Sequence, residues 1–189
     1  IPIKGLHLLL EALYLLKDKF PNMKLYIGGK DLSNNIGLRN ILAQTDYQKY
    51  INSLIKKFDL TKRVNFTGFL NEKQVIKKLL KSHIFVLTSF IENSPNALAE
   101  AQMIGTPSIA SLVGGNANYI SDKLTGLLYN SDEAVILASK IESILVDDHF
   151  AQMLSRNEIE IATKRHDQDK NSNTLFNIYK DITQKYKKL

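Results

Sequence analysis

The sequence predicts an α/β fold in which helices cover both faces of a doubly wound parallel sheet. Short apolar runs, typical of buried strands, alternate along the chain with longer segments in which apolar residues recur at helical spacing. The chain has 189 residues, of which 44% are hydrophobic, and this is enough to build a sizeable core. Strands and helices that alternate in this way imply parallel strands joined by right-handed crossovers.

The first part of the chain predicts two helices and two strands. Leucines at three- and four-residue spacing favour a helix over 5–19, and the apolar run at 24–29 predicts a buried strand that ends in paired glycines. The polar stretch at 30–46 is expected to be a loop. It leads into a helix over 47–58, and the alternating pattern at 63–69 predicts the second strand.

A capping box marks the next helix. Asn71 followed by Gln74 is the pair of side chains that satisfies the first free backbone N–H groups of a helix, so a helix is expected over 71–81. The continuous apolar run at 83–89 then predicts a third strand, buried on both faces.

The rest of the chain repeats these signals. A helix is expected from Pro95, and apolar runs predict strands at 107–111 and 125–130. The remaining helices share apolar residues at helical spacing and are expected near 117–122 and at 132–146, 148–162 and 170–186. This order of elements is that of a Rossmann-like fold.

The net charge of +6 decides little by itself. Part of the excess lies in the segments TKRH (163–166) and QKYKK (184–188), which we interpret as solvated helix faces. A binder of single-stranded nucleic acid would alternate aromatic and basic residues, and an RNA-recognition sheet would carry a glycine–aromatic signature. Neither pattern is present, so no nucleic-acid partner is expected.

The composition also argues against a metal centre. There is no cysteine, which excludes disulfides and thiolate ligands. Histidine occurs only at four scattered positions: His7, His83, His149 and His166. We therefore expect neither a metal nor another cofactor.

No stretch of about 18 apolar residues is present, and the first residues lack the features of a signal peptide. The expectation is a cytoplasmic chain. The sequence enters a helical pattern at residue 5 without a leader, so we interpret it as part of a longer protein.

The segment after the third expected strand is the candidate binding site. In an open parallel sheet, ligands bind in the crevice at the carboxyl ends of the strands, where residues 90–94 form a rim loop. Pro95 suits the first helical position. The free N–H groups at about Asn96, Ala97 and Leu98 would then favour an anion such as a phosphate.

Two carboxylates flank this helix start. Glu100 lies one turn beyond Asn96, and its side chain leans back toward the crevice, while Glu92 approaches from the loop. Carboxylates accept hydrogen bonds in pairs, so they suit polyols such as a ribose and a sugar ring. A ligand with two polyol ends and a diphosphate between them satisfies both acids and the helix start.

Several short segments together resemble a known family. In chain order they are Lys4 and Gly5, Glu92 and Glu100 separated by seven residues, PNALAEA at 95–101, GTP at 105–107, Gly114 and Gly115, and TGLLY at 125–129. They resemble the donor region of retaining GT-B glycosyltransferases of the group 1 type. The resemblance covers residues 4–145 in the expected order.

The resemblance implies that residues 1–189 form the C-terminal, nucleotide-sugar-binding half of a two-domain enzyme. Residues 4–145 would be its core and 146–189 its C-terminal helices, and the N-terminal acceptor domain would be absent. Such enzymes transfer a sugar to an acceptor with retention of anomeric configuration and without a metal.

The resemblance also assigns roles. Lys4 and Glu92 are the candidate catalytic residues: Lys4 would neutralise the donor diphosphate and Glu92 would hold hydroxyls of the transferred sugar. Glu100 would hold the ribose. The other residues expected to line the donor are Gly5, Asn93, Ser94, Pro95, Asn96 and Ala97.

Two features depart from the family pattern. The family has an Arg a few residues before its Lys-Gly pair, and this sequence begins too late to contain it. Where the family commonly has Glu after its Gly-Gly turn, this sequence has Asn118. The chain alone is therefore expected to bind the donor without turning it over.

Other interpretations remain open. The acids could be a glycosidase pair or ordinary solvated residues, and Asp167 and Asp169 imitate a metal-binding Asp-x-Asp but suit a helix-entry turn. The same fold could serve as a non-catalytic nucleotide-sugar-binding or partner module.

The C-terminal lysines could place an enzyme of polysaccharide or glycolipid biosynthesis against membrane-borne acceptors. The nucleotide base, expected near Gly28, Gly68 and Phe69, and the acceptor stay undetermined.

Overall fold

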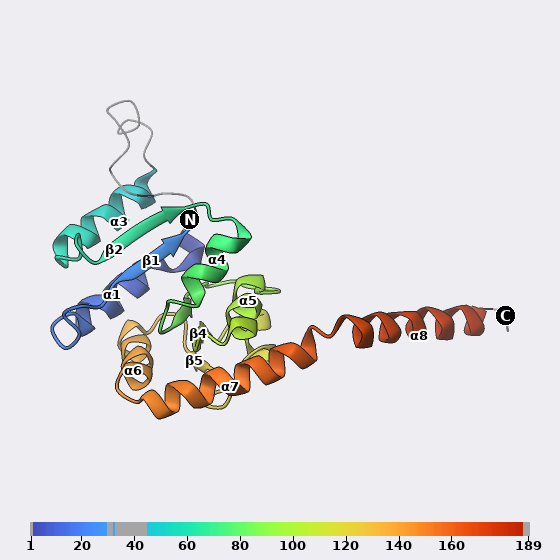
Figure 1. The fold of residues 1–189 in the computed structure, drawn as a ribbon. Coiled ribbons are helices and arrows are strands. Elements are labelled where there is room, and N and C mark those ends of the chain that lie inside the picture. The colour runs from blue at the N-terminus through green and yellow to red at the C-terminus, as the bar shows by residue number, and fades with distance from the viewer. Residues whose placement is uncertain (1, 30–31, 33–44, 187–189) are drawn as a thin grey trace.

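The computed structural model describes residues 2–29, 32 and 45–186. It is a mixed α/β structure whose helices pack around parallel strands (Figure 1). The helices are α1 (Leu6–Leu16), α3 (Asp46–Lys57), α4 (Glu72–Leu79), α5 (Asn96–Ile104), α6 (Ala134–Leu145), α7 (Asp148–Arg165) and α8 (Gln168–Tyr186), and the 3-10 helices are η1 (Pro2–Lys4) and η2 (Gly114–Asn118).

The strands form two parallel ladders. The first pairs β1 (Leu25–Gly28) with β2 (Val64–Gly68), and the second has the order β3 (Phe85–Leu87), β4 (Ser108–Ser111), β5 (Leu127–Tyr129). The parallel direction and the strand positions confirm the prediction. The strands do not form one continuous sheet, however. Among the described residues, no strand of the first group is hydrogen-bonded to a strand of the second.

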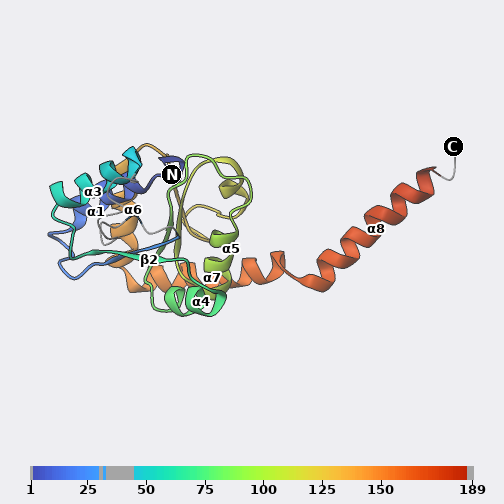
Figure 2. The ribbon, with the colours of Figure 1, turned by 90° about the horizontal axis from the view of Figure 1, so that it is seen from above.

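Helices lie on both sides of the strands. Seen from above, α1, α3 and α6 lie on one side of β2 and α4 lies on the other (Figure 2). Helix α1 packs against α3 and α6, and α5 packs against α7. This arrangement is the doubly wound layering that the alternating sequence predicts.

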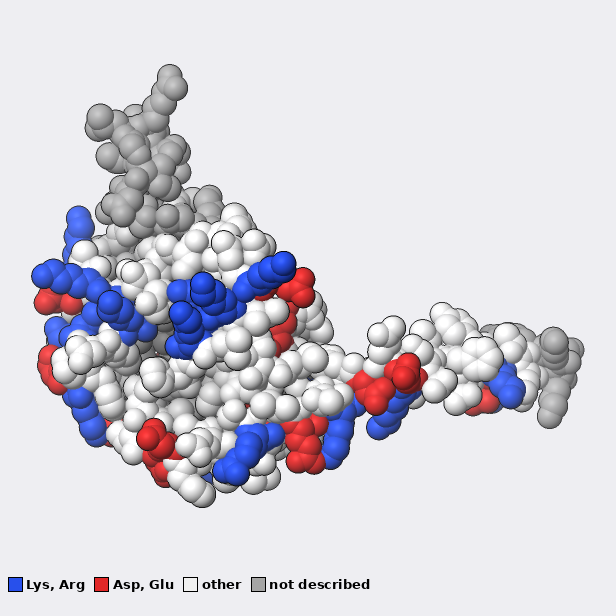
Figure 3. Space-filling view, in the orientation of Figure 1, with Lys and Arg blue, Asp and Glu red and all other residues white. Residues whose placement is uncertain are grey.

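The last helix, α8, extends away from the rest of the molecule (Figures 1 and 2). Its described side chains are exposed, including those of Leu175, Phe176, Ile178, Tyr179 and Ile182. In the space-filling view it remains separate from the body (Figure 3). No helix in the described ranges has the length and apolar character needed to cross a membrane.

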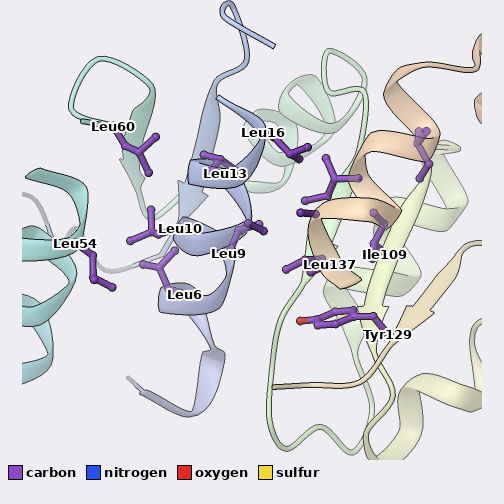
Figure 4. Close-up of a cluster of buried hydrophobic side chains, with 14 of the residues drawn as sticks. Leu6, Leu9, Leu10, Leu13, Leu16, Leu54, Leu60, Ile109, Tyr129 and Leu137 are labelled. Atoms are coloured by element: carbon purple, nitrogen blue, oxygen red, sulfur yellow. The ribbon is translucent and has the colours of Figure 1, made fainter. Parts of the chain in front are cut away.

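The main core is built around α1. Figure 4 shows five buried leucines of α1 between Leu54 and Leu60 on one side and Leu137, Ile109 and Tyr129 on the other; the five are Leu6, Leu9, Leu10, Leu13 and Leu16. Leu10 and Leu137 are fully buried. Burying a leucine contributes roughly 1.5–3 kcal/mol, so this cluster is a main source of the stability of the fold.

Local signals explain where several helices begin. The predicted capping box is confirmed: the Asn71 side chain accepts a hydrogen bond from Gln74 N–H, and the Gln74 side chain accepts one from Asn71 N–H. A second capping box, formed by Thr45 and Gln48, starts α3. Most of the loop expected at 30–46 lies outside the described residues.

Two predicted starts are wrong in detail. The helix expected near 117–122 is the 3-10 helix η2, which begins at Gly114 because Asn116 N–H donates to Val113 O and closes the first turn there. Pro95 is the cap of α5 and not its first helical residue.

Candidate functional site

The Lys4 and Glu92 side chains meet at the carboxyl end of β3. Lys4 Nζ lies 2.8 Å from Glu92 Oε2, although the residues are 88 positions apart. The Lys4 side chain is 52% exposed and that of Glu92 is 16% exposed. The ion pair is thus half open to solvent, where a ligand can reach the ammonium group.

Backbone contacts hold Lys4 at this place. Thr88 Oγ1 donates a hydrogen bond of 2.7 Å to Lys4 O, and Phe90 N–H donates one of 2.9 Å to Ile3 O. Gly5 follows with φ of 65°, and a Cβ on it would lie 2.0 Å from Thr88 O. Only glycine fits this close approach, which explains why Lys4 is followed by Gly5.

A second pair of glycines supports the loop that carries Glu92. A Cβ on Gly114 would lie 1.9 Å from Glu92 O, and one on Gly115 would lie 1.9 Å from Asn93 O. Gly115 N–H donates a hydrogen bond of 2.9 Å to Glu92 O. The start of η2 is therefore packed directly against the backbone of the rim loop.

Fewer backbone N–H groups are free at the start of α5 than the sequence predicts. Asn96 N–H donates to Ser94 O and Leu98 N–H donates to Pro95 O, both at 3.0 Å. No side chain caps the helix. Within the described part of the chain, Ala97 N–H has no hydrogen-bond partner, so it alone of the three expected groups remains available to an anion.

The two predicted carboxylates have different surroundings. Glu92 is paired and mostly covered, whereas Glu100 is exposed on α5 and accepts no hydrogen bond from any described residue. The structure brings Lys4 and Glu92 into contact. Glu100 lies on α5, the helix that follows the rim loop, and within the described residues it forms no hydrogen bond or ion pair with either of them.

A polar network that the sequence did not indicate lies behind the rim loop. The Arg165 guanidinium donates to Gln102 Oε1 at 3.0 Å and to the carbonyl oxygens of Asn118 and Tyr119 at 3.2 Å, and it lies 4.4 Å from the centroid of the Tyr119 ring. The Tyr119 hydroxyl lies 3.5 Å from Ser94 Oγ in the rim loop. The interpretation of 163–166 as a wholly solvated face is therefore wrong for Arg165.

Glu158 is a second polar residue that no pattern in the sequence indicated. It is fully buried, and it accepts hydrogen bonds from Ser108 N–H at 2.8 Å and from Ser108 Oγ at 3.1 Å. Burial raises the pKa of the Glu158 carboxyl to about 8, against the lowering effect of the two hydrogen bonds. The contact fixes α7 to the first residue of β4.

Across the described ranges, no three His, Asp or Glu side chains gather in a group that could hold a metal ion. The expectation that the reaction needs no metal remains a prediction.

The sequence matches the family described as glycosyl transferases group 1 over residues 1–161. One curated relative, an uncharacterized glycosyltransferase of Methanocaldococcus jannaschii, is 25% identical over 94% of this chain. The chain spans only 42% of that relative's length.

Solved structures share the fold. Sucrose-phosphate synthase from Thermosynechococcus elongatus is 25% identical, with a TM-score of 0.77, over 97% of this chain and 43% of its own. HepE from Anabaena in complex with UDP is 23% identical, with a TM-score of 0.75, over 100% of this chain and 46% of its own. In both cases the similar part is less than half of a longer protein.

Proposed function

The chain belongs to the glycosyl transferases group 1 family, and from this premise we propose that it is the donor-binding domain of a retaining glycosyltransferase. Its fold is that of the C-terminal, Rossmann-like domain of GT-B glycosyltransferases. The reaction would move a sugar from a nucleoside-diphosphate sugar to a sugar or lipid-linked acceptor. Polysaccharide or glycolipid biosynthesis in the cytoplasm is the proposed setting.

The contact between Lys4 and Glu92 is the observation that carries the proposal. It places a half-exposed ammonium group and a carboxylate together at the carboxyl end of a parallel strand, where open α/β sheets bind ligands. A diphosphate would draw the ammonium group away from Glu92. The released carboxylate would then be free to accept hydrogen bonds from sugar hydroxyls.

The chemistry required of these groups is electrostatic. When the sugar leaves, negative charge develops on the diphosphate, and a fixed cation beside it lowers the barrier. Lys4 would supply that cation, and the unpaired Ala97 N–H at the start of α5 would add a hydrogen bond. We propose that this stabilisation is the main contribution of the domain, without a metal or other cofactor.

The donor contacts are proposed by residue. Glu92 would bind the transferred sugar and Glu100, which is exposed and unpaired within the described chain, would bind the ribose diol. Backbone groups of Asn93 to Ala97, together with Gly5, would line the diphosphate and the sugar. The named structural relative HepE was solved with UDP and with UDP-glucose, which supports a nucleotide-sugar donor.

Calorimetric titration with UDP, GDP and ADP tests the proposal. One nucleotide should saturate the wild-type chain, and Glu100→Gln should weaken that binding at least about tenfold, because a hydrogen bond to a charged group contributes about 1.5–3 kcal/mol. Glu92→Gln should leave the free nucleotide unaffected and weaken only the nucleotide sugar. Glu160→Gln, an exposed change on α7, is the matched control.

The possible outcomes test the roles of Glu92 and Glu100 separately from the donor-binding function of the chain. Equal loss of free nucleotide in Glu92→Gln and Glu100→Gln would overturn the division of roles. Absence of saturation with each of the three nucleotides would contradict a donor site in this chain. Turnover of a nucleotide sugar by the longer protein would separate the enzyme from a non-catalytic module of the same fold.

A further inference from the structure

Helix α4 presents a face of alternating basic and aliphatic side chains to solvent. Leu79 is the one residue of this helix that is buried. At about 100° per residue, one side of the helix and its C-terminal cap carries a set of five side chains. They are Lys73, Ile76, Lys77, Leu80 and Lys81, and we call this set the α4 face.

The aliphatic members of the α4 face are unusually open. Leu80 is 67% exposed and Ile76 is 39% exposed, and Phe69, two residues before the helix cap, is 85% exposed. Exposed apolar residues that occur singly need no explanation. Here two of them lie one turn apart on a face that otherwise consists of lysines, which is the pattern of a helix at a membrane surface.

The three lysines of the α4 face are free cations. Within the described part of the chain, none of Lys73, Lys77 and Lys81 forms an ion pair. Figure 3 shows Lys and Arg side chains gathered over the region of α4 and the β1–β2 ladder, with few acids among them. The one acid of α4 is Glu72 in its first turn, which lies one turn before Ile76 at the edge of the α4 face.

The basic segment at 163–166 is less available. Lys164 is paired with Glu160, and the Arg165 guanidinium is bound to Gln102 and to carbonyl oxygens. The basic residues of this segment are therefore largely occupied within the fold. The α4 face is neither paired nor covered.

We infer that the α4 face docks on an anionic membrane surface. Its lysines would lie among the negative headgroups, where each contributes about 1 kcal/mol, and Ile76 and Leu80 would enter the boundary between headgroups and acyl chains. A single-stranded nucleic acid fits less well, because its binding sites add aromatic side chains on which bases stack. The inference concerns a surface that is separate from Lys4 and Glu92, so it holds whether or not the donor site is assigned correctly.

Vesicle co-sedimentation at low salt tests the inference. The 189-residue chain should bind mixed phosphatidylcholine–phosphatidylglycerol vesicles and should not bind phosphatidylcholine alone. Replacing Lys73, Lys77 and Lys81 by alanine should weaken binding about 100-fold, since about 1 kcal/mol per lysine corresponds to about fivefold each. Leu80→Ser should weaken it several-fold and leave the lysines in place.

The matched control replaces three exposed lysines of α8, Lys170, Lys180 and Lys185, by alanine. This change alters the net charge equally and should leave vesicle binding within about threefold. Equal binding to both vesicle types, or equal loss in the α4 and α8 variants, would overturn the inference. Saturable binding of a single-stranded oligonucleotide that the α4 triple variant abolishes would also overturn it, in favour of nucleic acid.

Discussion

The two parallel ladders of this protein differ in how deeply they are buried. Each residue of β4 is buried, and so are two of the three in β5. Strand β1 alternates between half-buried and exposed positions, and β2 is half-buried except at Asn65, which is exposed. The rim loop and Lys4 are attached to this second ladder at Thr88, which is buried and follows the three half-buried residues of β3. The candidate donor site is therefore built on the part of the molecule that can hold side chains in fixed positions.

The largest effect on stability is expected in a comparison of two glycines with nearly the same φ angle. Gly5, beside the buried ladder, has φ of 65°, and Gly68, at the end of β2, has φ of 69°. A Cβ on Gly5 would meet Thr88 O at 2.0 Å, while one on Gly68 would meet no atom within 4 Å. Gly5→Ala should cost about 4 kcal/mol or more, because strand and loop must move apart.

Gly68→Ala is the control for backbone strain alone and should cost about 1–2 kcal/mol. Urea unfolding followed by circular dichroism measures both changes. If the two variants lose equal stability, the close packing of residue 5 against Thr88 does not determine the position of Lys4.

The second prediction concerns Glu158, which ties α7 to the buried ladder. An unfolded Glu ionises near pH 4.3, whereas burial raises the folded pKa of Glu158 to about 8. Between these values the folded chain binds one more proton than the unfolded chain, so stability falls by about 1.4 kcal/mol per pH unit. The contribution is complete below pH 4.3 and is lost as the pH rises through 8.

Glu158→Gln keeps the shape of the side chain and removes the carboxyl group that titrates. Relative to this variant, the wild type should lose about 3 kcal/mol of unfolding free energy between pH 5.5 and pH 8, measured by urea unfolding. Glu160→Gln, exposed two residues further along α7, should retain the wild-type slope. An identical pH dependence in all three proteins would show that Glu158 is ionised in the fold.

The smallest expected effect is at Arg165, which links α7 to the rim loop through Tyr119. Arg165→Lys keeps the charge but loses the planar fork that reaches Gln102 Oε1 and two carbonyl oxygens. It should cost about 1–2 kcal/mol and should speed hydrogen exchange at residues 93–98.

Arg156→Lys is the matched change, since Arg156 is exposed on the same helix and, among the described residues, donates only to Gln152 O. It should alter stability by less than about 0.5 kcal/mol and leave exchange at 93–98 unchanged. Equal exchange in the two variants would mean that the Arg165 network does not reach the rim loop.

Local patterns in the sequence predicted most of the fold. All five strands lie within their expected ranges, and the capping box at Asn71 starts α4 as predicted. The division into two ladders was not predictable, because strand pairing depends on packing between distant segments. The start of η2 was not predicted, because Gly114 and Gly115 pack against the backbone of residues 92–93. No local sequence pattern reveals that contact.

The site was predicted in part. The resemblance selected Lys4 and Glu92, which the structure brings to 2.8 Å, but the roles of these residues and of Glu100 stay predictions. Arg165 with Gln102 and Glu158 with Ser108 were missed, since the partners lie 63 and 50 residues apart and each looks like an ordinary helix or strand residue. Their importance comes from burial and partners, which only the folded chain supplies.

The contact of Gly114 and Gly115 with the rim loop bears on how such a domain can diversify. The glycines touch the carbonyl oxygens of Glu92 and Asn93, which any amino acid possesses. Side chains at positions 93 and 94 can therefore be exchanged without loosening the contact, whereas inserting or deleting one residue would displace both oxygens. Substitution libraries in this loop should yield folded variants with altered sugar preference, and libraries of loop length should yield mostly unfolded ones.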